Sequence, residues 1–163
     1  MFAQNFHPSM KFAAGPRKEI GVPTVFNILG PLTNPAGASN QLIGVSNLNI
    51  GELMAHVLKR LGTKRAIIVY GKDGLDEITI TTDSILWILD DKGISKTEIS
   101  PKQFGFSTSP IENIMVKDSV ESACMIRNIL SGSEKGSPRD IVIMNSAVAL
   151  FCLGIVSDIE TGV

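Results

Sequence analysis

Residues 41–70 read QLIGVSNLNIGELMAHVLKRLGTKRAIIVY, a pattern typical of two strands joined by a helix. Residues 41–46 predict a short buried strand, and residues 51–61 predict a helix whose apolar side chains form one stripe before Gly62 ends it. Residues 66–70 are continuously apolar and largely β-branched, as in a strand that is covered on both faces. Strand, helix and strand in this order predict a parallel crossover unit, so we expect an α/β fold.

Three further short strands are predicted on the C-terminal side of this unit, at residues 78–82, 85–89 and 97–99. The sequence Asp-Asp-Lys-Gly at residues 90–93 predicts a turn between the last two of them. Together they favour an antiparallel meander.

Two helices are predicted after the meander. Asp118, with Glu121 three residues later, resembles a capping box at the start of a helix that ends near Gly132. Residues 137–156 predict a strongly apolar helix with a Ser-Pro start, which we expect in the core. On the N-terminal side, proline and glycine punctuate residues 7–40 and predict short elements joined by tight turns.

The composition is that of one soluble globular domain: 163 residues, 44% hydrophobic, with a net charge of −1. These values argue against a disordered chain and against a basic nucleic-acid-binding protein. Residues 141–156 form the longest apolar stretch, shorter than the about 18 residues of a membrane span, and no secretory leader is recognisable, so we expect a cytoplasmic protein. Cys124 and Cys152 lack metal-ligand spacing and are expected to be buried thiols.

Charge is unevenly divided along the chain. Residues 1–70 hold seven basic and two acidic side chains, and residues 71–163 hold eight basic and fourteen acidic ones. Such a division can steer an anionic ligand, and it also fits an ordinary solvated surface.

The first candidate site is residues 70–77, Tyr-Gly-Lys-Asp-Gly-Leu-Asp-Glu, directly after the second strand of the crossover. Open α/β sheets bind ligands beyond the carboxyl ends of such strands. Two glycines permit a sharp turn in which Asp76 and Glu77 can converge on a hard cation such as Mg²⁺. An acidic pair after a glycine turn also fits a plain solvated loop.

The second candidate site begins at His7, in the sequence HPSM, and includes Arg17. The planar guanidinium group of Arg17 suits bidentate binding of a carboxylate or a phosphate, although neighbouring Lys18 and Glu19 also fit a surface arginine. The sequence contains no Walker A, GxGxxG, HExxH, GxSxG or CxxC motif. We therefore assign no catalytic residue.

The segments HPSMKFAAGPRKEIGVPTVFNILGPLTNPA (residues 7–36) and VYGKDGLDE (residues 69–77) together resemble anthranilate phosphoribosyltransferase, and the likeness extends to NSAVALFCLG (residues 145–154). The resemblance implies the catalytic domain shared by phosphoribosyltransferases and nucleoside phosphorylases, a mixed β-sheet flanked by helices. It also suggests a short helix at residues 24–29, whose β-branched content by itself favours a strand. The implied activity belongs to tryptophan biosynthesis: transfer of the phosphoribosyl group of phosphoribosyl pyrophosphate to the amine of anthranilate, with release of pyrophosphate.

The resemblance also implies roles for four residues. Arg17 matches the family arginine that contacts the anthranilate carboxylate, and His7 matches the histidine that lines the anthranilate path. Asp76 and Glu77 match the acidic pair that holds Mg²⁺ on the diphosphate. The implied partners are the two substrates, with no membrane and no nucleic acid.

Three family features do not occur in the 163 residues: a GTGGD-type diphosphate loop, a KHGNR-type basic segment and the N-terminal helical domain that forms the family homodimer. We therefore expect residues 1–163 to be a single partial catalytic domain, truncated at both ends. An acidic pair without its phosphate cradle would repel the diphosphate, so we expect little or no transferase activity from this chain alone.

Other interpretations stay open. One is a fold relative or a fragment that has no catalytic activity, with nucleic acid as an alternative ligand. The net charge of −1 and the presence of Arg17 with the acidic pair argue against nucleic-acid binding. The other is an enzyme similar to pyrimidine nucleoside phosphorylase, against which the HPSM sequence and Arg17 argue.

Overall fold

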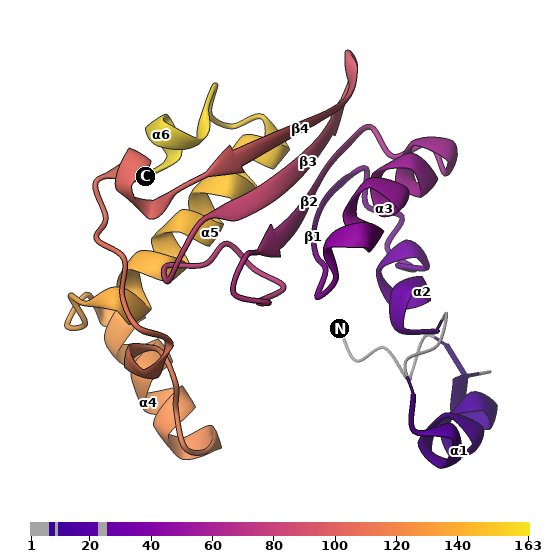
Figure 1. Ribbon diagram of the computed structural model, residues 1–163, viewed down its shortest axis with the longest axis horizontal. Helices are drawn as coiled ribbons and strands as arrows, with labels where there is room; N and C mark the ends of the chain where they lie inside the picture. Colours follow the sequence, from indigo (N-terminus) through magenta and orange to yellow (C-terminus); the bar gives the residue numbers. More distant parts are fainter. Residues whose placement is uncertain (1–6, 9, 23–25) are drawn as a thin grey trace. The chain divides into compact units, whose positions relative to one another are not determined.

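The computed structural model describes residues 7–8, 10–22 and 26–163 of the chain. The chain divides into two compact units, Met1–Ala38 and Ser39–Val163 (Figure 1). The crossover unit, the meander and the apolar helix predicted from the sequence all belong to the second unit.

The first unit contains helices α1 (Met10–Ile20) and α2 (Phe26–Leu32). Residues 26–29 are therefore helical, as the family resemblance suggests, whereas Thr24 and Val25 lie outside the described residues. Thr33 closes α2, because its Oγ1 donates a hydrogen bond to the Leu29 carbonyl at 3.0 Å.

The second unit begins with the predicted crossover: β1 (Asn40–Gly44), α3 (Leu48–Arg60) and β2 (Arg65–Gly71). β1 and β2 are parallel, with Asn40 opposite Arg65 and Gly44 opposite Val69. α3 starts three residues before the predicted helix because Asn47 caps it, its side chain accepting from the Asn49 N–H at 2.9 Å. The α/β prediction is confirmed.

The sheet continues with two antiparallel strands, β3 (Ser84–Asp90) and β4 (Gly93–Ile99), and its order is β1-β2-β3-β4. Tyr70 of β2 lies opposite Ile85 of β3, and Asp90 lies opposite Gly93 across the predicted turn. The result is a mixed sheet with one parallel pair and two antiparallel pairs.

The strand predicted at residues 78–82 is wrong: this segment is irregular. Ile78 and Ile80 are fully buried, which explains the apolar alternation that mimics a strand. The main chain of this segment is bonded by side chains and by the Ser109 N–H, which donates to the Ile80 carbonyl at 3.1 Å, instead of by a neighbouring strand. For example, the Thr79 N–H donates to Ser84 Oγ at 3.0 Å.

After the sheet the chain forms two short 3-10 helices, η2 (Pro101–Phe104) and η3 (Ile111–Asn113), and then α4 (Ser119–Ser131), α5 (Ser137–Leu153) and α6 (Ile159–Gly162). Asp118 caps α4 as predicted, accepting from the N–H groups of Val120 and Glu121, both at 2.9 Å. α5 ends three residues before the predicted boundary, because Gly154 adopts a left-handed conformation (φ 74°). Among the helices of the described residues, none combines the length and the apolar character that a membrane span requires.

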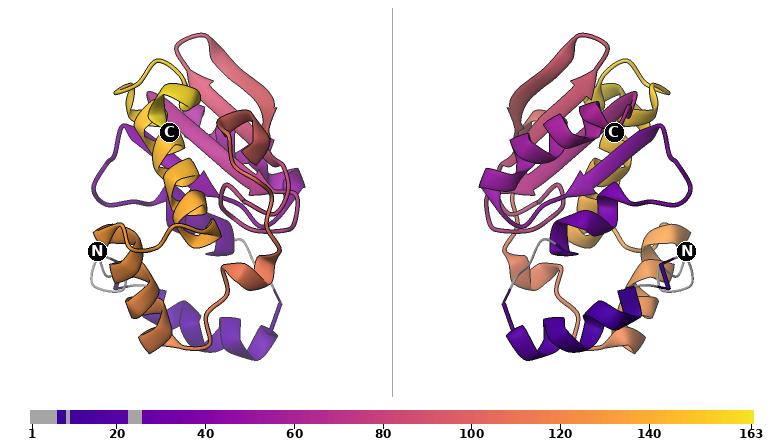
Figure 2. Two further views of the ribbon diagram at one scale, coloured as in Figure 1. Left: turned by 90° about the vertical axis from the view of Figure 1, so that its left-hand side faces the viewer. Right: turned by 90° about the vertical axis from the view of Figure 1, so that its right-hand side faces the viewer.

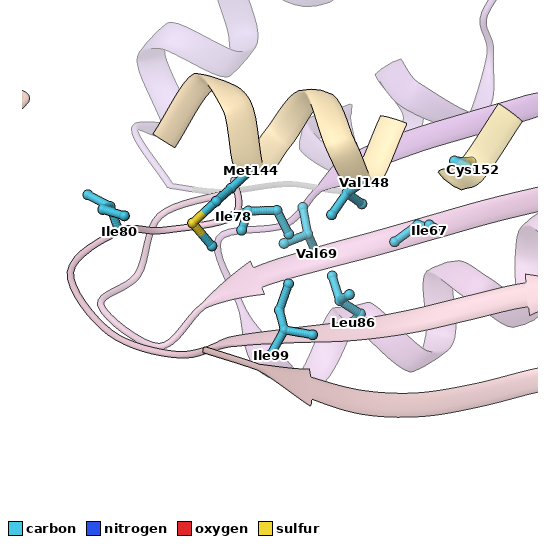
Figure 3. Packing of buried hydrophobic residues seen from close by; sticks show 9 residues of the cluster. All are labelled: Ile67, Val69, Ile78, Ile80, Leu86, Ile99, Met144, Val148 and Cys152. Atoms are coloured by element: carbon cyan, nitrogen blue, oxygen red, sulfur yellow. The ribbon is translucent and has the colours of Figure 1, made fainter. Parts of the chain in front are cut away.

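α5 and α3 cover opposite faces of the sheet (Figure 2). On the α5 face, buried side chains from the helix and the strands form one cluster around Ile67 and Val69, which both come from β2 (Figure 3). On the α3 face, Gly51 lets the helix approach the Trp87 ring, which a Cβ at this position would meet at 2.2 Å. Because α3 and α5 cover both faces of β2, its side chains are apolar on both faces, which explains its continuous apolar run. The cluster on the α5 face comprises Ile67, Val69, Ile78, Ile80, Leu86, Ile99, Met144, Val148 and Cys152.

Candidate functional site

The loop between β2 and β3, residues 72–83, carries the predicted acidic pair. A tight turn opens the loop: the Gly74 N–H donates to the Gly71 carbonyl and the Gly71 N–H donates to the Leu75 carbonyl, both at 2.8 Å. Gly74 has φ +97°, a conformation that L side chains rarely adopt, and a Cβ on Gly71 would lie 2.6 Å from Asp73 Oδ1. The prediction that two glycines permit this turn is confirmed.

Asp73 organises the loop, a role that we did not predict. Its Oδ2 accepts hydrogen bonds from the hydroxyl groups of Thr79, at 2.6 Å, and Thr81, and its Oδ1 accepts from the Leu75 N–H at 3.1 Å. Partial burial disfavours the charged carboxylate, but these hydrogen bonds outweigh that effect and hold the pKa of Asp73 below its ordinary value. An aspartate two residues before the N–H that it binds is an Asx-turn pattern, so the sequence contains a signal for part of this role.

Asp76 and Glu77 are both exposed. Within the described residues, neither carboxylate forms a hydrogen bond or an ion pair. The main chain of Asp76, in contrast, lies against Gly44 at the carboxyl end of β1: a Cβ on Gly44 would be 1.6 Å from the Asp76 carbonyl oxygen. The pair therefore stands where both parallel strands end, with its carboxylates open to a ligand.

The carboxylates of Asp76 and Glu77 have the oxygen chemistry that Mg²⁺ prefers. The part of the chain that the structure describes contains no group of three or more His, Cys, Asp or Glu side chains placed to hold a metal ion. Two carboxylates nevertheless fit Mg²⁺, because this ion keeps several waters and is commonly shared with substrate phosphates. The donor set thus suits a metal bound jointly by protein and ligand.

A side chain from α5 fixes the residue after the acidic pair. Asn145 Oδ1 accepts a hydrogen bond from the Ile78 N–H at 3.0 Å, and Asn145 Nδ2 donates to the Ile78 carbonyl at 2.8 Å. The same Nδ2 donates to the Ile141 carbonyl at 2.9 Å. From the sequence, Asn145 is recognisable only as a polar interruption of an apolar helix.

Lys72 does not neutralise the acidic pair. Its Nζ is hydrogen-bonded to Glu98 of β4 and lies 3.9 Å from Asp83 Oδ2. The hydrogen bond to Glu98 raises the pKa of Lys72. Lys72, the cationic residue nearest to the acidic pair in the sequence, therefore interacts with the carboxylates of Glu98 and Asp83.

His7 and Arg17 belong to the first unit, whereas Asp76 and Glu77 belong to the second. His7 is half-buried and precedes α1, and Arg17 lies on α1. Of the HPSM sequence, Ser9 is outside the described residues. The structure thus brings Asp76 and Glu77 onto one loop and gives His7 and Arg17 a common N-terminal unit.

The cysteine prediction holds for one residue only. Cys152 is buried on α5, and its Sγ donates to the Gln41 carbonyl at 3.3 Å. Cys124 is exposed on α4, which corrects the expectation that both thiols are buried. No residue of α4 is buried, so the apolar surroundings that the sequence suggested do not enclose this thiol.

Comparison with known proteins covers the whole chain. Residues 1–163 match the family described as glycosyl transferase family, a/b domain. Anthranilate phosphoribosyltransferase of Acetivibrio thermocellus is 47% identical over 163 residues, which are 100% of this chain and 47% of the relative. The enzyme of the same name from Brevibacillus brevis is also 47% identical over 163 residues, 100% of this chain and 48% of the relative. The chain thus spans about half the length of the curated relatives it matches.

Solved structures agree with this result. Anthranilate phosphoribosyltransferase from Thermus thermophilus superposes with a TM-score of 0.86 at 34% identity, covering 96% of this chain and 46% of that one. The Saccharomyces cerevisiae enzyme, in complex with PRPP and Mg, superposes with a TM-score of 0.83 at 27% identity, covering 96% of this chain and 45% of that one. The mixed sheet and its flanking helices are therefore those of a known catalytic domain.

Proposed function

The chain belongs to the glycosyl transferase family through that family's α/β domain, and from this membership we propose that it forms part of an anthranilate phosphoribosyltransferase. Relatives of that name at 47% identity support the proposal. The observation that carries it furthest is the acidic pair, exposed and unbonded among the described residues, on the loop beyond the two parallel strands. We further propose a cytoplasmic enzyme of tryptophan biosynthesis.

In the proposed reaction, the amine nitrogen of anthranilate forms a bond to C1 of the ribose while the bond from C1 to pyrophosphate breaks. Pyrophosphate leaves with the bonding electron pair, and the amine loses a proton. An aromatic amine is uncharged at neutral pH, so the reaction depends more on placement and on charge stabilisation than on a strong base. This fits a sequence in which no catalytic base is recognisable.

We assign Asp76 and Glu77 to Mg²⁺ on the diphosphate. Bound Mg²⁺ offsets negative charge on a leaving pyrophosphate. The two carboxylates are open to a ligand, and the main chain beside them is packed against Gly44. A further structure of the yeast enzyme, 27% identical to this chain, is described as having Mg bound.

We assign Arg17 to the anthranilate carboxylate and His7 to the path that anthranilate follows. A guanidinium group can donate two parallel hydrogen bonds to a carboxylate. Both assignments come from the matching positions in the HPSM segment and the residues after it.

A chimera tests the proposal. The matched segment of the Acetivibrio thermocellus relative is replaced by residues 1–163 of this chain, and the fall in anthranilate fluorescence is followed after addition of phosphoribosyl pyrophosphate and Mg²⁺. We expect turnover that requires both additions. Arg17→Ala should raise the KM for anthranilate by about tenfold or more, because a charged hydrogen bond is lost. Asp76→Asn with Glu77→Gln should abolish turnover or raise the Mg²⁺ requirement.

Matched variants separate these effects from a non-specific loss of activity that any similar substitution would cause. Arg127→Ala removes an exposed arginine of α4, and Asp90→Asn with Asp91→Asn alters an acidic pair at the end of β3 and in the turn that follows it. Both controls should behave as the unaltered chimera. A folded chimera without turnover, or an unchanged KM in Arg17→Ala, would contradict the corresponding assignment.

The same samples address the alternative functions. Phosphorolysis of a pyrimidine nucleoside in phosphate buffer would favour a nucleoside phosphorylase, and a salt-dependent gel shift with single-stranded DNA would favour nucleic-acid binding. We also propose that the 163-residue chain by itself has little or no transferase activity, since it contains no glycine-rich diphosphate loop. Robust Mg²⁺-dependent turnover by the purified chain would contradict this.

A further inference from the structure

The main chain on the C-terminal side of the acidic pair is held across the fold. Ile78 directly follows Glu77, and both of its main-chain polar groups are bonded to Asn145 of α5, at 3.0 Å and 2.8 Å. Asn145 lies 67 positions along the chain from Ile78. The hydrogen bonds therefore tie the loop to the helix that covers this face of the sheet.

The main chain on the other side of the pair is fixed by packing. The Asp76 carbonyl fits against Gly44, where even a methyl group would overlap it. On the C-terminal side, directly after Ile78, the Thr79 N–H also donates to Ser84 Oγ at 3.0 Å. The acidic pair thus has a restrained main chain and, within the described residues, unbonded carboxylates.

The amide of Asn145 suits this task because it offers a donor and an acceptor in one plane. Its third hydrogen bond, to the Ile141 carbonyl at 2.9 Å, fixes the side chain against its own helix. On the same helix, Met144 and Val148 are buried in the core. A leucine would fill a similar volume there but would leave the Ile78 main chain without these partners.

We propose that Asn145 is a positioning residue for the acidic pair: by bonding the Ile78 main chain it holds Asp76 and Glu77 in the arrangement that binds a divalent cation. The proposal rests on the metal role assigned to the pair under the proposed function. Residues that orient metal ligands set metal affinity without touching the ion, and their loss typically weakens binding by about 10- to 100-fold. Asn145 acts through the main chain, so we expect a loss of about tenfold.

The experiment uses the 163-residue chain and measures Mn²⁺ binding by electron paramagnetic resonance, since Mn²⁺ accepts the oxygen ligands that suit Mg²⁺. Asn145→Leu removes the hydrogen bonds at nearly constant volume, and Asn145→Ser is a second variant that is too short to bridge Ile78. Val148→Ala is the control, because it removes buried packing one turn further along α5 without altering the Ile78 bonds. Asp76→Asn with Glu77→Gln measures the Mn²⁺ binding that does not depend on the acidic pair. Hydrogen exchange at the Ile78 amide is measured on each folded variant.

We expect weaker Mn²⁺ binding and faster Ile78 exchange in the folded Asn145 variants, with both properties unchanged in Val148→Ala. Normal Mn²⁺ affinity in an Asn145 variant, while the acidic double variant loses binding, would overturn the positioning role and leave the metal site intact. Equal weakening in Val148→Ala would also overturn it. Wild-type binding no stronger than that of the acidic double variant would overturn the metal assignment and this inference together.

Discussion

Gly44, the last residue of β1, lies directly against the main chain of Asp76, so that a Cβ on Gly44 would be 1.6 Å from the Asp76 carbonyl oxygen. Real Cβ atoms do not approach an oxygen so closely, and the contact is with main chain, which cannot rotate away. The first strand of the sheet therefore determines where the acidic loop can pass. This couples the packing of the crossover unit to the geometry of the candidate metal site.

Gly44→Ala should consequently destabilise the chain and displace the acidic pair. Overpacking of this kind typically costs about 1–3 kcal/mol of unfolding free energy. Urea denaturation measures the loss, and Mn²⁺ binding measures the displacement. Ser46→Ala is the matched control: Ser46 is exposed two residues later, and its change should stay within about 0.5 kcal/mol. A Gly44→Ala chain as stable as the control would show that the loop has another low-energy path.

The stability of the loop should depend on pH through Asp73. Burial opposes its ionisation, but the hydrogen bonds from Thr79, Thr81 and the Leu75 N–H dominate, so its pKa in the folded chain lies below the ordinary value of 3.8. The unfolded chain therefore takes up a proton first as the pH falls. The stabilisation is present in full above about pH 4 and is lost progressively below it, down to the lowered folded pKa.

Asp73→Asn removes this titration. The difference in unfolding free energy between wild type and variant should be constant from pH 7 to about 5 and should shrink as the pH falls below about 4. Thr81→Val, which removes one of the bonds that lower the pKa, should show a smaller pH-dependent component than wild type. If the difference between wild type and Asp73→Asn stayed constant down to about pH 2.5, the assigned role of these hydrogen bonds would be contradicted.

The crossover unit could be predicted because its information is local. The apolar stripe of α3 and the continuous apolar run of β2 each lie within one element, and the structure confirms both. The strand predicted at residues 78–82 failed for a non-local reason. Its apolar alternation is real, but Asn145, 67 residues away, and Ser84 bond its main chain, and no strand in the described part of the chain pairs with it.

The candidate site likewise contains some features that follow from local sequence and others that depend on residues distant in the sequence. The glycine turn and the exposed acidic pair follow from adjacent residues, as does the Asx turn of Asp73 that we did not predict. The contact between Gly44 and Asp76 joins two segments whose proximity no local pattern encodes. The roles of His7 and Arg17 stay predictions, since they come from family resemblance alone.

The two thiols should differ sharply in reactivity. Cys124 is exposed on α4, whereas Cys152 is buried and burial raises the pKa of its thiol. Because the thiolate is the reactive form, a disulfide reagent at about pH 8 should modify one thiol quickly and the second only as the chain unfolds. Cys124→Ser should remove the fast phase and Cys152→Ser the slow one. Two fast phases in the folded protein would contradict the burial of Cys152.

The contact between α3 and the sheet is testable through the single tryptophan of the chain. Trp87 is 2% exposed, and a Cβ at Gly51 would lie 2.2 Å from its ring. Gly51→Ala improves helix propensity by about 1 kcal/mol, but overpacking typically costs about 1–3 kcal/mol and should outweigh this gain.

We expect Gly51→Ala to lower the urea midpoint and to shift tryptophan emission to longer wavelength, because the displaced ring becomes accessible to water. Glu52→Ala, at the adjacent exposed position of α3, should leave the emission unchanged. If Gly51→Ala were stabilised and its emission unaltered, the helix and the ring would be able to accommodate the added methyl group without exposing Trp87. The close approach at Gly51 would then not be what fixes α3 on this face.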